Sequence, residues 1–308
     1  MSLPSISVIT PTLNQAGFIR ATIESVLSQE YYGLEYQVMD GGSTDGTLEI
    51  LKSYAGSLSY RSARDKGQSD AINQGWRNTS GELIAWLNSD DLYRPEALKR
   101  VGTFFSNHPE VSLVYGDCDL IDSAGQVLQP YRTRPYDYLA LLRTAVNYLP
   151  QPATFVRRSV LEAEGGLDES LAYLMDFDYW LRIGLHHRAA YLPATLAALR
   201  FHDAAKSVAQ FGKFAIEQVR VYQKLFARPD LPPEVRSLEK EATGMAYYRA
   251  ADCAFWAGCL AEARSYAGES IQRLKRPRSL WLWLALGQTG RRLVGKLYPN
   301  PYIPGGAL

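Results

Sequence analysis

The chain has 308 residues and a formal net charge of +1 at pH 7, with 46% hydrophobic and 21% charged residues. These proportions are ordinary for a globular protein and leave room for one large α/β domain with an appendage. The three cysteines, Cys118, Cys253 and Cys259, lack paired metal-ligand spacing, which excludes a disulfide framework and favours a reducing compartment.

The sequence shows no signal segment at its amino terminus and no membrane-spanning run. The amino terminus lacks a basic-then-apolar signal segment, and no uninterrupted apolar run reaches membrane-spanning length. We therefore expect a cytoplasmic protein.

The first elements alternate between strand and helix patterns. Ile6–Thr10 is a short β-rich run that ends in the polar turn Pro11–Asn14, and apolar residues at helical spacing follow over Ile19–Leu27. A second β-rich run, Tyr36–Met39, ends in the glycine-rich turn 40–46, and a helix carried by Leu48, Ile50, Leu51 and Tyr54 comes next.

The next strand ends in a pair of acids. Leu83–Leu87 reads as a buried strand, and Asn88, Ser89, Asp90 and Asp91 follow it directly. Adjacent carboxylates resist burial unless a cation or hydrogen-bond donors offset them, so this turn suits Mg²⁺ or Mn²⁺. A solvated turn that caps the helix opening at Ala97 is the alternative.

Strand, polar turn and helix in repetition predict parallel strands joined by right-handed crossovers. Each polar cluster follows a strand, and open α/β sheets bind ligands beyond the carboxyl ends of their strands. The glycine-rich turn fits neither a dinucleotide fingerprint nor a P-loop, which argues against hydride transfer and P-loop NTPase activity.

Four motifs in this order resemble family 2 glycosyltransferases over roughly residues 4–210. They are Thr10-Pro-Thr-x-Asn14, Asp40-Gly-Gly-Ser-Thr-Asp-Gly-Thr47, Asp65-Lys-Gly67 with Asp70-Ala-Ile-Asn73-x-Gly75, and Asn88-Ser-Asp-Asp91. The family comprises inverting enzymes that use sugar nucleotides. The resemblance implies an α/β protein of the GT-A fold, with a mostly parallel central sheet flanked by helices.

The resemblance also implies a set of binding residues. Asp40 would meet the nucleobase, and Asp90 would hold the metal that bridges the diphosphate, with Asp91 beside it. Asn88 stands where many relatives carry an acid, so it is expected to accept from a ribose hydroxyl or to bind through its carbonyl. The full implied nucleotide set is Thr10, Pro11, Thr12, Asn14, Asp40, Asp65, Lys66, Asn88, Ser89 and Asp90.

Transfer from a nucleotide diphosphate to a hydroxyl needs one further group, a base that accepts the proton of the acceptor. Asp176 and Asp178 fall in or before the first turn of a helix that carries Phe177 and Trp180. In the resembling family an acidic residue at the place of Asp176 is the presumed base, preceded by another acid where this chain has Met175. The alternative is that both acids only cap the helix.

Several further residues are candidates, each with a bland alternative. Gln151 is expected to contact sugar or acceptor, or else to be a satisfied polar residue at a strand start. Asp117 lies in a hairpin with its turn at Ser123–Gly125. Trp180 is an acceptor or sugar platform, or else a core residue. His202 resembles the family's histidine that reaches the metal or diphosphate, or else is an ordinary loop histidine.

Residues 211–272 look all-helical, and Met245–Ile271 resembles one tetratricopeptide-type helical hairpin around Gly258. We expect it to brace the catalytic domain or to make a homo-oligomer contact. From Ser270 onward the sequence is basic without acids and contains the apolar run Leu280–Leu286. This tail suits either an interfacial helix on an anionic membrane or a helix packed onto the enzyme, while nucleic-acid binding is disfavoured by the acidic remainder.

These observations predict two regions. Residues 1–210 form the transferase domain, with 1–110 binding the nucleotide sugar and 111–210 the acceptor, and residues 211–308 form a helical region. The expected activity is metal-dependent inverting transfer of a hexose from a nucleotide-diphosphate sugar, with UDP favoured, to a glycan or lipid-linked acceptor in polysaccharide biosynthesis. A non-catalytic sugar-nucleotide binding or scaffold protein is the alternative.

Overall fold

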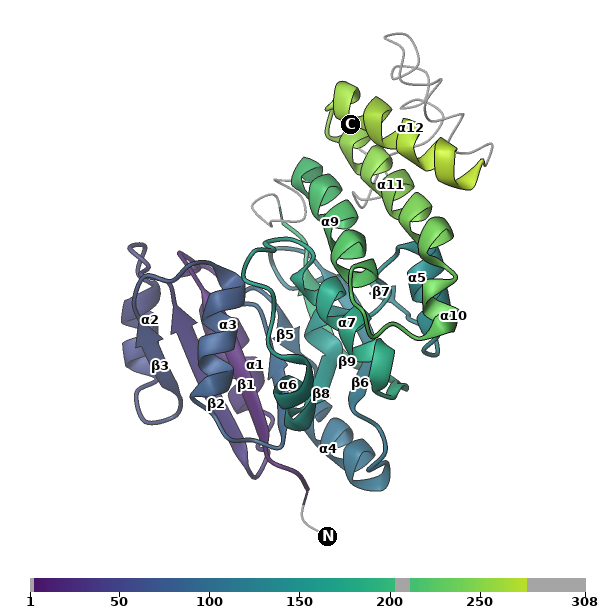
Figure 1. The fold of residues 1–308 in the computed structure, drawn as a ribbon. Coiled ribbons are helices and arrows are strands. Elements are labelled where there is room, and N and C mark those ends of the chain that lie inside the picture. Colours follow the sequence, from purple (N-terminus) through teal and green to yellow (C-terminus); the bar gives the residue numbers. More distant parts are fainter. Residues whose placement is uncertain (1–2, 203–210, 276–308) are drawn as a thin grey trace. The chain divides into compact units, whose positions relative to one another are not determined.

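The computed structural model describes residues 3–202 and 211–275, which fall into two compact units (Figure 1). The first unit comprises residues up to Tyr136 together with Asn147–Phe201. The second comprises Asp137–Val146 and the described residues from His202 onward. Residues 137–146 therefore belong to the second unit, although the residues before and after them in the sequence belong to the first.

The first half of unit one alternates strands and helices, as the sequence pattern predicts. Their bounds are β1 Ile6–Thr12, α1 Ile19–Leu27, β2 Leu34–Asp40, α2 Thr47–Ser53, β3 Ser59–Ser62, α3 Gln68–Arg77 and β4 Leu83–Trp86. Strand β1 lies between β2 and β4 and is parallel to both, and β3 extends the sheet parallel to β2. The expected parallel strands with crossover helices are thus confirmed in this half.

The second half of unit one is mixed. Its elements are β5 Leu92–Tyr93, α4 Ala97–Asn107, β6 Leu113–Ile121, β7 Val127–Tyr131, the short 3-10 helix η1 Gln151–Ala153, β8 Thr154–Arg157, α6 Arg158–Glu164, α7 Met175–His186 and β9 Ala189–Arg200. The sheet order is β3-β2-β1-β4-β8-β6-β9-β5, with β7 on β6. Strand β8 pairs with both β4 and β6, antiparallel to each, and so connects the two halves of the sheet. The predicted β6–β7 hairpin is present.

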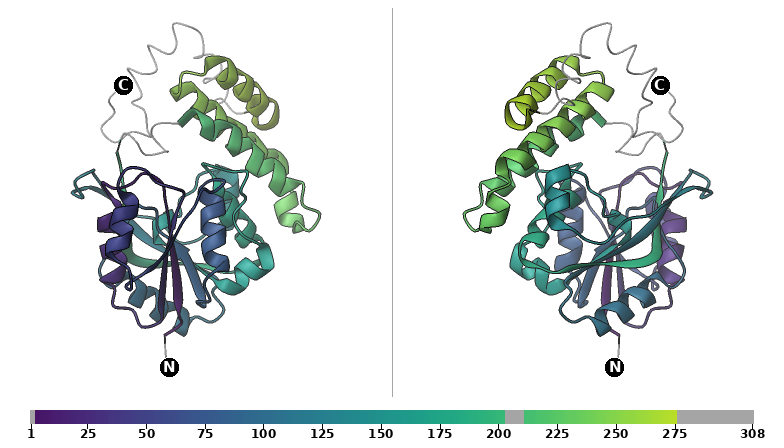
Figure 2. Two further views of the ribbon diagram at one scale, coloured as in Figure 1. Left: turned by 90° about the vertical axis from the view of Figure 1, so that its left-hand side faces the viewer. Right: turned by 90° about the vertical axis from the view of Figure 1, so that its right-hand side faces the viewer.

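The two faces of the sheet carry different cores. Ile6 and Val8 of β1 pack with residues of α1, α2 and α4, whereas Ile9 faces α3. A Cβ atom at Gly75 would lie 2.6 Å from Ile9, so α3 approaches β1 more closely than any side chain at 75 would allow. Each fully buried aliphatic side chain contributes about 1.5–3 kcal/mol. Figure 2 shows the helices on both sides of the strands.

The second unit is helical. Its described elements are α5 Tyr138–Thr144, the 3-10 helix η2 Phe211–Lys213, α9 Phe214–Phe226, α10 Pro233–Arg236, α11 Glu239–Trp256 and α12 Leu260–Leu274. The predicted hairpin is α11 and α12, which meet around Gly258 at φ +84°. Small buried residues such as Ala250, Ala254 and Ala263 let the helices pack closely.

One predicted feature, the apolar run Leu280–Leu286 of the basic tail, lies outside the described residues. Among the residues that the structure does describe, no helix is both long and apolar enough to cross a membrane.

Candidate functional site

The ends of β1 and β2 meet in register at one edge of the sheet. Thr12 pairs with Asp40, and the Thr12 carbonyl accepts from the Gly41 amide at 2.9 Å. The hydroxyl of Thr10 is buried against that of Tyr36, 3.1 Å away. By contrast, the buried Thr12 hydroxyl has no hydrogen-bond partner among the residues that the structure describes. A buried polar group without a hydrogen bond is costly, so this hydroxyl is suited to pair with a ligand.

Asp40 organises the glycine-rich turn that follows it. Its carboxylate accepts from the Ser43 hydroxyl at 2.5 Å and from the Ser62 hydroxyl at 2.6 Å, and it is only 2% exposed. Asn14 ties the preceding turn to the same segment, because its amide donates to the Ser43 hydroxyl and its side-chain oxygen accepts from the Thr44 amide. Two of the predicted nucleotide segments are therefore bonded to each other.

The Asp65–Lys66 turn lies against this glycine-rich turn. Asp65 accepts from the Gly67 amide at 2.8 Å, and a Cβ atom at Gly41 would come within 2.8 Å of the Asp65 carboxylate. Lys66 is exposed, and its backbone amide donates to Asp70 of α3 at 3.0 Å. That hydrogen bond is the largest cause that lowers the pKa of Asp70. The close approach of the Asp65 carboxylate to residue 41 explains why this residue is a glycine.

Asn88 is the centre of an amide network after β4. Its side-chain oxygen accepts from Gln68 at 2.7 Å, and its side-chain nitrogen donates to Asp91 and to Gln151 at 3.2 Å each. Gln151 in turn donates to the Trp86 carbonyl at 2.7 Å. A carboxylate at position 88 has no N–H to donate. An amide is therefore the side chain that satisfies these partners in this chain.

Asp91 is enclosed. It is 1% exposed, and its two carboxylate oxygens accept from the Arg200 amide at 2.9 Å and from Asn88. Burial, followed by the negative charge of Asp90, raises the pKa of Asp91 well above its ordinary value. Both oxygens are thus already engaged with neutral N–H donors.

Asp90 is the more open of the two acids. It is only partly buried, and its backbone carbonyl accepts from the Arg200 guanidinium at 2.8 Å. No group of three acidic, cysteine or histidine side chains converges among the described residues. Mg²⁺ is commonly bound by one or two carboxylates together with substrate phosphates rather than by a protein cage. A turn with one open carboxylate fits that kind of site.

Asp176 lies in the first turn of α7, as predicted, and is partly buried. Asn147 donates to one carboxylate oxygen at 2.8 Å, and the Phe177 amide donates to the other at 2.7 Å. Asp178, two residues further, is buried and forms an ion pair with Arg182 at 2.9 Å. The two acids of this turn therefore have different surroundings.

Of the candidate acceptor residues, Trp180 requires a correction. It is fully buried and stacks on Trp86 with ring centroids 5.6 Å apart, so it is a core residue and has no face for a sugar. Asp117 is largely enclosed by Arg132, the Thr133 amide and the Tyr191 hydroxyl. Roles for Asp117 and Gln151 in acceptor binding stay predictions.

His202 belongs to the second unit and is partly buried. Its predicted metal role stays a prediction.

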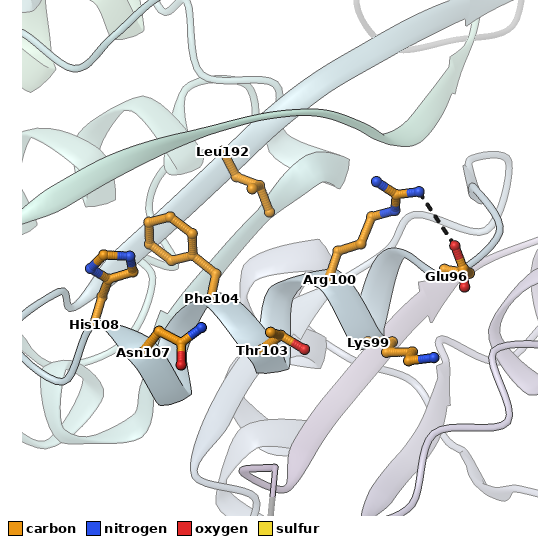
Figure 3. A pocket seen from close by; sticks show the side chains of 8 residues that line it. All are labelled: Glu96, Lys99, Arg100, Thr103, Phe104, Asn107, His108 and Leu192. Carbon is orange, nitrogen blue, oxygen red and sulfur yellow. Dashed lines mark hydrogen bonds and ion pairs between the residues drawn. The ribbon is translucent and has the colours of Figure 1, made fainter.

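A separate hollow of about 410 Å³ lies along α4 (Figure 3). It is lined by Glu96, Lys99, Arg100, Thr103, Phe104, Asn107, His108 and Leu192. None of the predicted site residues lines it.

Three residues of the site have roles that the sequence does not reveal. Arg200 holds the acidic turn through both its amide and its guanidinium, Asn147 holds Asp176, and Gln68 holds Asn88. Gln68 directly follows the Asp65-Lys-Gly67 motif and Arg200 lies two residues before the candidate His202, and that proximity is the signal they carry. Asn147 stands next to no recognised motif.

Comparison with known proteins agrees with this geometry. Residues 7–164, just over half of the chain, match the family described as glycosyl transferase family 2. An uncharacterized glycosyltransferase of Rickettsia typhi is 29% identical over 232 residues, which are 73% of this chain and 71% of that protein. A PGL/p-HBAD biosynthesis glycosyltransferase of Mycobacterium bovis is 38% identical over 122 residues, 38% of this chain and 48% of that protein.

Solved structures show the same fold. TarS residues 1–349 from S. aureus, in complex with UDP-GlcNAc, match with a TM-score of 0.70 and 17% identity, covering 94% of this chain and 92% of that one. The mannosyltransferase PcManGT from Pyrobaculum calidifontis, with GDP-Man and Mn²⁺, matches with a TM-score of 0.59 and 21% identity, covering 97% and 88%. The expected GT-A fold is thereby confirmed. With this fold and a family match over half its length, the chain belongs to glycosyl transferase family 2.

Proposed function

We propose that this protein is a metal-dependent inverting glycosyltransferase that moves a hexose from a UDP-sugar to a glycan or lipid-linked acceptor in polysaccharide biosynthesis. The observation that carries the proposal is the sheet edge where Thr12, with its unpartnered hydroxyl, pairs in register with Asp40. The solved relatives that hold UDP-GlcNAc, or GDP-Man with Mn²⁺, support a nucleotide-sugar donor.

Asp90 is the residue proposed to hold Mg²⁺ or Mn²⁺, with Asp91 beside it. A bound divalent ion would neutralise the charge that develops on the leaving diphosphate. Asp91 contributes chiefly by supporting the turn, because both its oxygens already accept hydrogen bonds from Arg200 and Asn88.

Asp176 is proposed as the general base. It accepts the proton of the acceptor hydroxyl while that oxygen attacks the anomeric carbon, and the nucleotide diphosphate departs from the opposite side. A single displacement of this kind inverts the anomeric configuration. Asn147 and the Phe177 amide each donate to the carboxylate, which fixes its orientation.

A thermal-shift and turnover experiment tests the proposal. The full chain is mixed with UDP-GlcNAc, UDP or GDP-mannose, with and without Mn²⁺, and release of UDP or GDP is then followed by an enzyme-coupled assay. We expect a donor-dependent rise in the melting temperature that Mn²⁺ enlarges, together with turnover. Asp230→Ala, an exposed acid of the helical unit, is the matched control for Asp90→Ala.

The outcomes separate the two function classes. Stabilisation by a nucleotide sugar without any release of nucleotide would favour the binding or scaffold protein. Equal stabilisation with and without Mn²⁺ would contradict metal dependence while leaving the transferase proposal in place.

We also propose peripheral association of this otherwise cytoplasmic protein with an anionic membrane, on the grounds of the basic tail alone. Each cation near such a surface contributes about 1 kcal/mol, which salt screens. The chain should therefore sediment with anionic vesicles at low salt and less so at high salt. A variant with Arg276, Arg278, Arg291 and Arg292 replaced by glutamine should stay in solution, whereas equal sedimentation of both proteins would overturn the proposal.

A further inference from the structure

Helix α3 contacts both of the predicted nucleotide turns through its first residues. Gln68 donates to Asn88 at 2.7 Å, and Asp70 accepts from the Lys66 amide at 3.0 Å. Through Asp70, the motif Asp70-Ala-Ile-Asn73 thus supports one of the turns predicted to bind the donor. Asn73, the last residue of the motif, has different partners.

Asn73 instead holds the segment that leads to α7. Its side-chain nitrogen donates to the Leu167 carbonyl and its side-chain oxygen accepts from the Leu167 amide, both at 2.9 Å. The Ser69 hydroxyl, one turn earlier on the same face, lies 3.1 Å from the Leu171 carbonyl. Asn73 and Ser69 are 6% and 3% exposed, so water does not compete for these bonds.

Asn73 is in close contact with Gly166 in addition to its hydrogen bonds with Leu167. A Cβ atom at Gly166 would lie 2.4 Å from the Asn73 side-chain oxygen, so any side chain at 166 would push the segment off the helix. From the other direction, Arg182 of α7 donates to the Gly166 carbonyl at 2.7 Å. Residues 166–171 are therefore held between α3 and α7.

This segment runs directly into the turn that carries Asp176. The Ser69 hydroxyl lies 2.8 Å from the Met175 sulfur, and Met175 is the first residue of α7. A shift of residues 167–171 would therefore move the start of α7 relative to the end of β4. Such a shift would displace the Asp176 carboxylate from the donor without touching the nucleotide turns.

We propose that Asn73 is a positioning residue for Asp176, which it places by fixing residues 166–171 on α3. The proposal rests on the proposed role of Asp176 as base. It assigns one helix to both halves of the reaction: Gln68 and Asp70 support donor binding, while Asn73 and Ser69 support proton acceptance. A merely structural Asn73 would lower stability and would affect all kinetic constants alike.

The first test is a split between kcat and KM, measured as UDP release from UDP-GlcNAc with water or a p-nitrophenyl glycoside as acceptor. Asn73→Ala should lower kcat by about 10- to 100-fold, because small misplacements of a reacting group cost up to that much. The KM for UDP-GlcNAc should change by less than about twofold. Gly166→Ala should reproduce the split through the close contact alone. Asn78→Ala, which changes an exposed amide directly after the last residue of α3, should behave as wild type.

The second test is a double-mutant cycle. If Asn73 acts through Asp176, Asn73→Ala should have little further effect in the Asp176→Asn background. Losses that multiply would overturn the positioning role while leaving Asp176 as base. Near-wild-type turnover by Asp176→Asn alone would instead remove the proposed base, and the inference with it.

Hydrogen exchange provides a readout besides activity. The Leu167 amide donates to Asn73, so Asn73→Ala should speed exchange in residues 166–171 and leave the β1 and β4 amides unchanged. Unchanged exchange in that segment, or faster exchange throughout the first unit, would each contradict the proposal.

Discussion

The turn after β4 and the first turn of α7 each carry two acids, and in each turn one acid is enclosed and the other is partly open. Asp91 and Asp178 are almost fully buried, whereas Asp90 and Asp176 are partly exposed. The enclosed acids differ in their partners. Asp178 pairs with the Arg182 guanidinium, whereas the Asp91 carboxylate accepts from two neutral N–H groups, the Arg200 amide and the Asn88 side chain.

This difference in partners distinguishes the two enclosed acids. Burial and the neighbouring charge of Asp90 raise the pKa of Asp91, whereas Asp178 has the Arg182 guanidinium as its partner. The partly exposed neighbour in each turn is the acid proposed to take part in the reaction. In both turns the first acid is partly exposed and the second is buried, so the two turns share this arrangement and differ in the partner of the buried acid.

The largest effect is expected at the open acid of α7. Asp176→Asn is nearly isosteric but cannot accept a proton, so kcat should fall by roughly 10²–10⁴. Donor affinity, measured by titration with UDP-GlcNAc, should barely change. A variant within a few-fold of the wild-type rate would assign the base elsewhere.

The enclosed acid of the same turn should govern stability instead. Asp178→Ala leaves the Arg182 guanidinium without its carboxylate, and breaking a buried pair costs about 3–5 kcal/mol. Urea unfolding should show this loss, and Asp176→Ala should show a much smaller one. Equal losses for the two variants would erase the distinction between open and enclosed acids.

At the other turn, Asp90→Ala should remove the part of nucleotide affinity that Mn²⁺ adds. We expect at least about a tenfold weaker binding of UDP at saturating Mn²⁺, equivalent to about 1.4 kcal/mol, and no change without the ion. Isothermal titration with and without Mn²⁺ measures both values. An undiminished Mn²⁺ effect in the variant would transfer the role to another residue.

The smallest effect concerns pH. Because the pKa of Asp91 is raised, the folded chain holds that proton longer than the unfolded chain, and stability falls as pH rises from about 4 through the folded pKa. Asp90→Asn removes a charge that raises this pKa, so the variant should gain stability relative to wild type between pH 4 and pH 7. A gain on the order of 1 kcal/mol is expected from thermal unfolding at the two pH values. A difference that does not depend on pH would contradict this coupling.

The first half of the fold could be predicted from the sequence because its strands are short apolar runs bounded by glycine and acids. β1, β2 and β4 lie where Ile6–Thr10, Tyr36–Met39 and Leu83–Leu87 predict them. The twelve-residue β9 gives no such signal. Pro193 interrupts it, and its register against β6 shifts between Gly116 and Asp117, so neither a two-residue nor a helical period is visible.

The residues of the site also divide into those that the sequence predicts and those that it does not. Asp90 and Asp176 stand out because acids at the end of a strand or the start of a helix have a local explanation. Asn147 and Asn73 do not, since an amide can serve many partners and theirs lie 29 and 94 residues away. Trp180 was a candidate for sugar contact because aromatic residues suit both sugars and cores, and only its burial decides between them.

The aromatic residues beneath the acidic turns give the site an optical signature. Trp76, Trp86 and Trp180 are each buried, with Trp86 5.6 Å from both of the others. Indole rings that close and that rigidly arranged couple electronically and give strong circular dichroism in the near ultraviolet, which disappears when fixed packing is lost. Trp86 is the last residue of β4, just before the Asn88–Asp91 turn. The near-ultraviolet circular dichroism of these rings thus reports on the packing that supports that turn, without any added label.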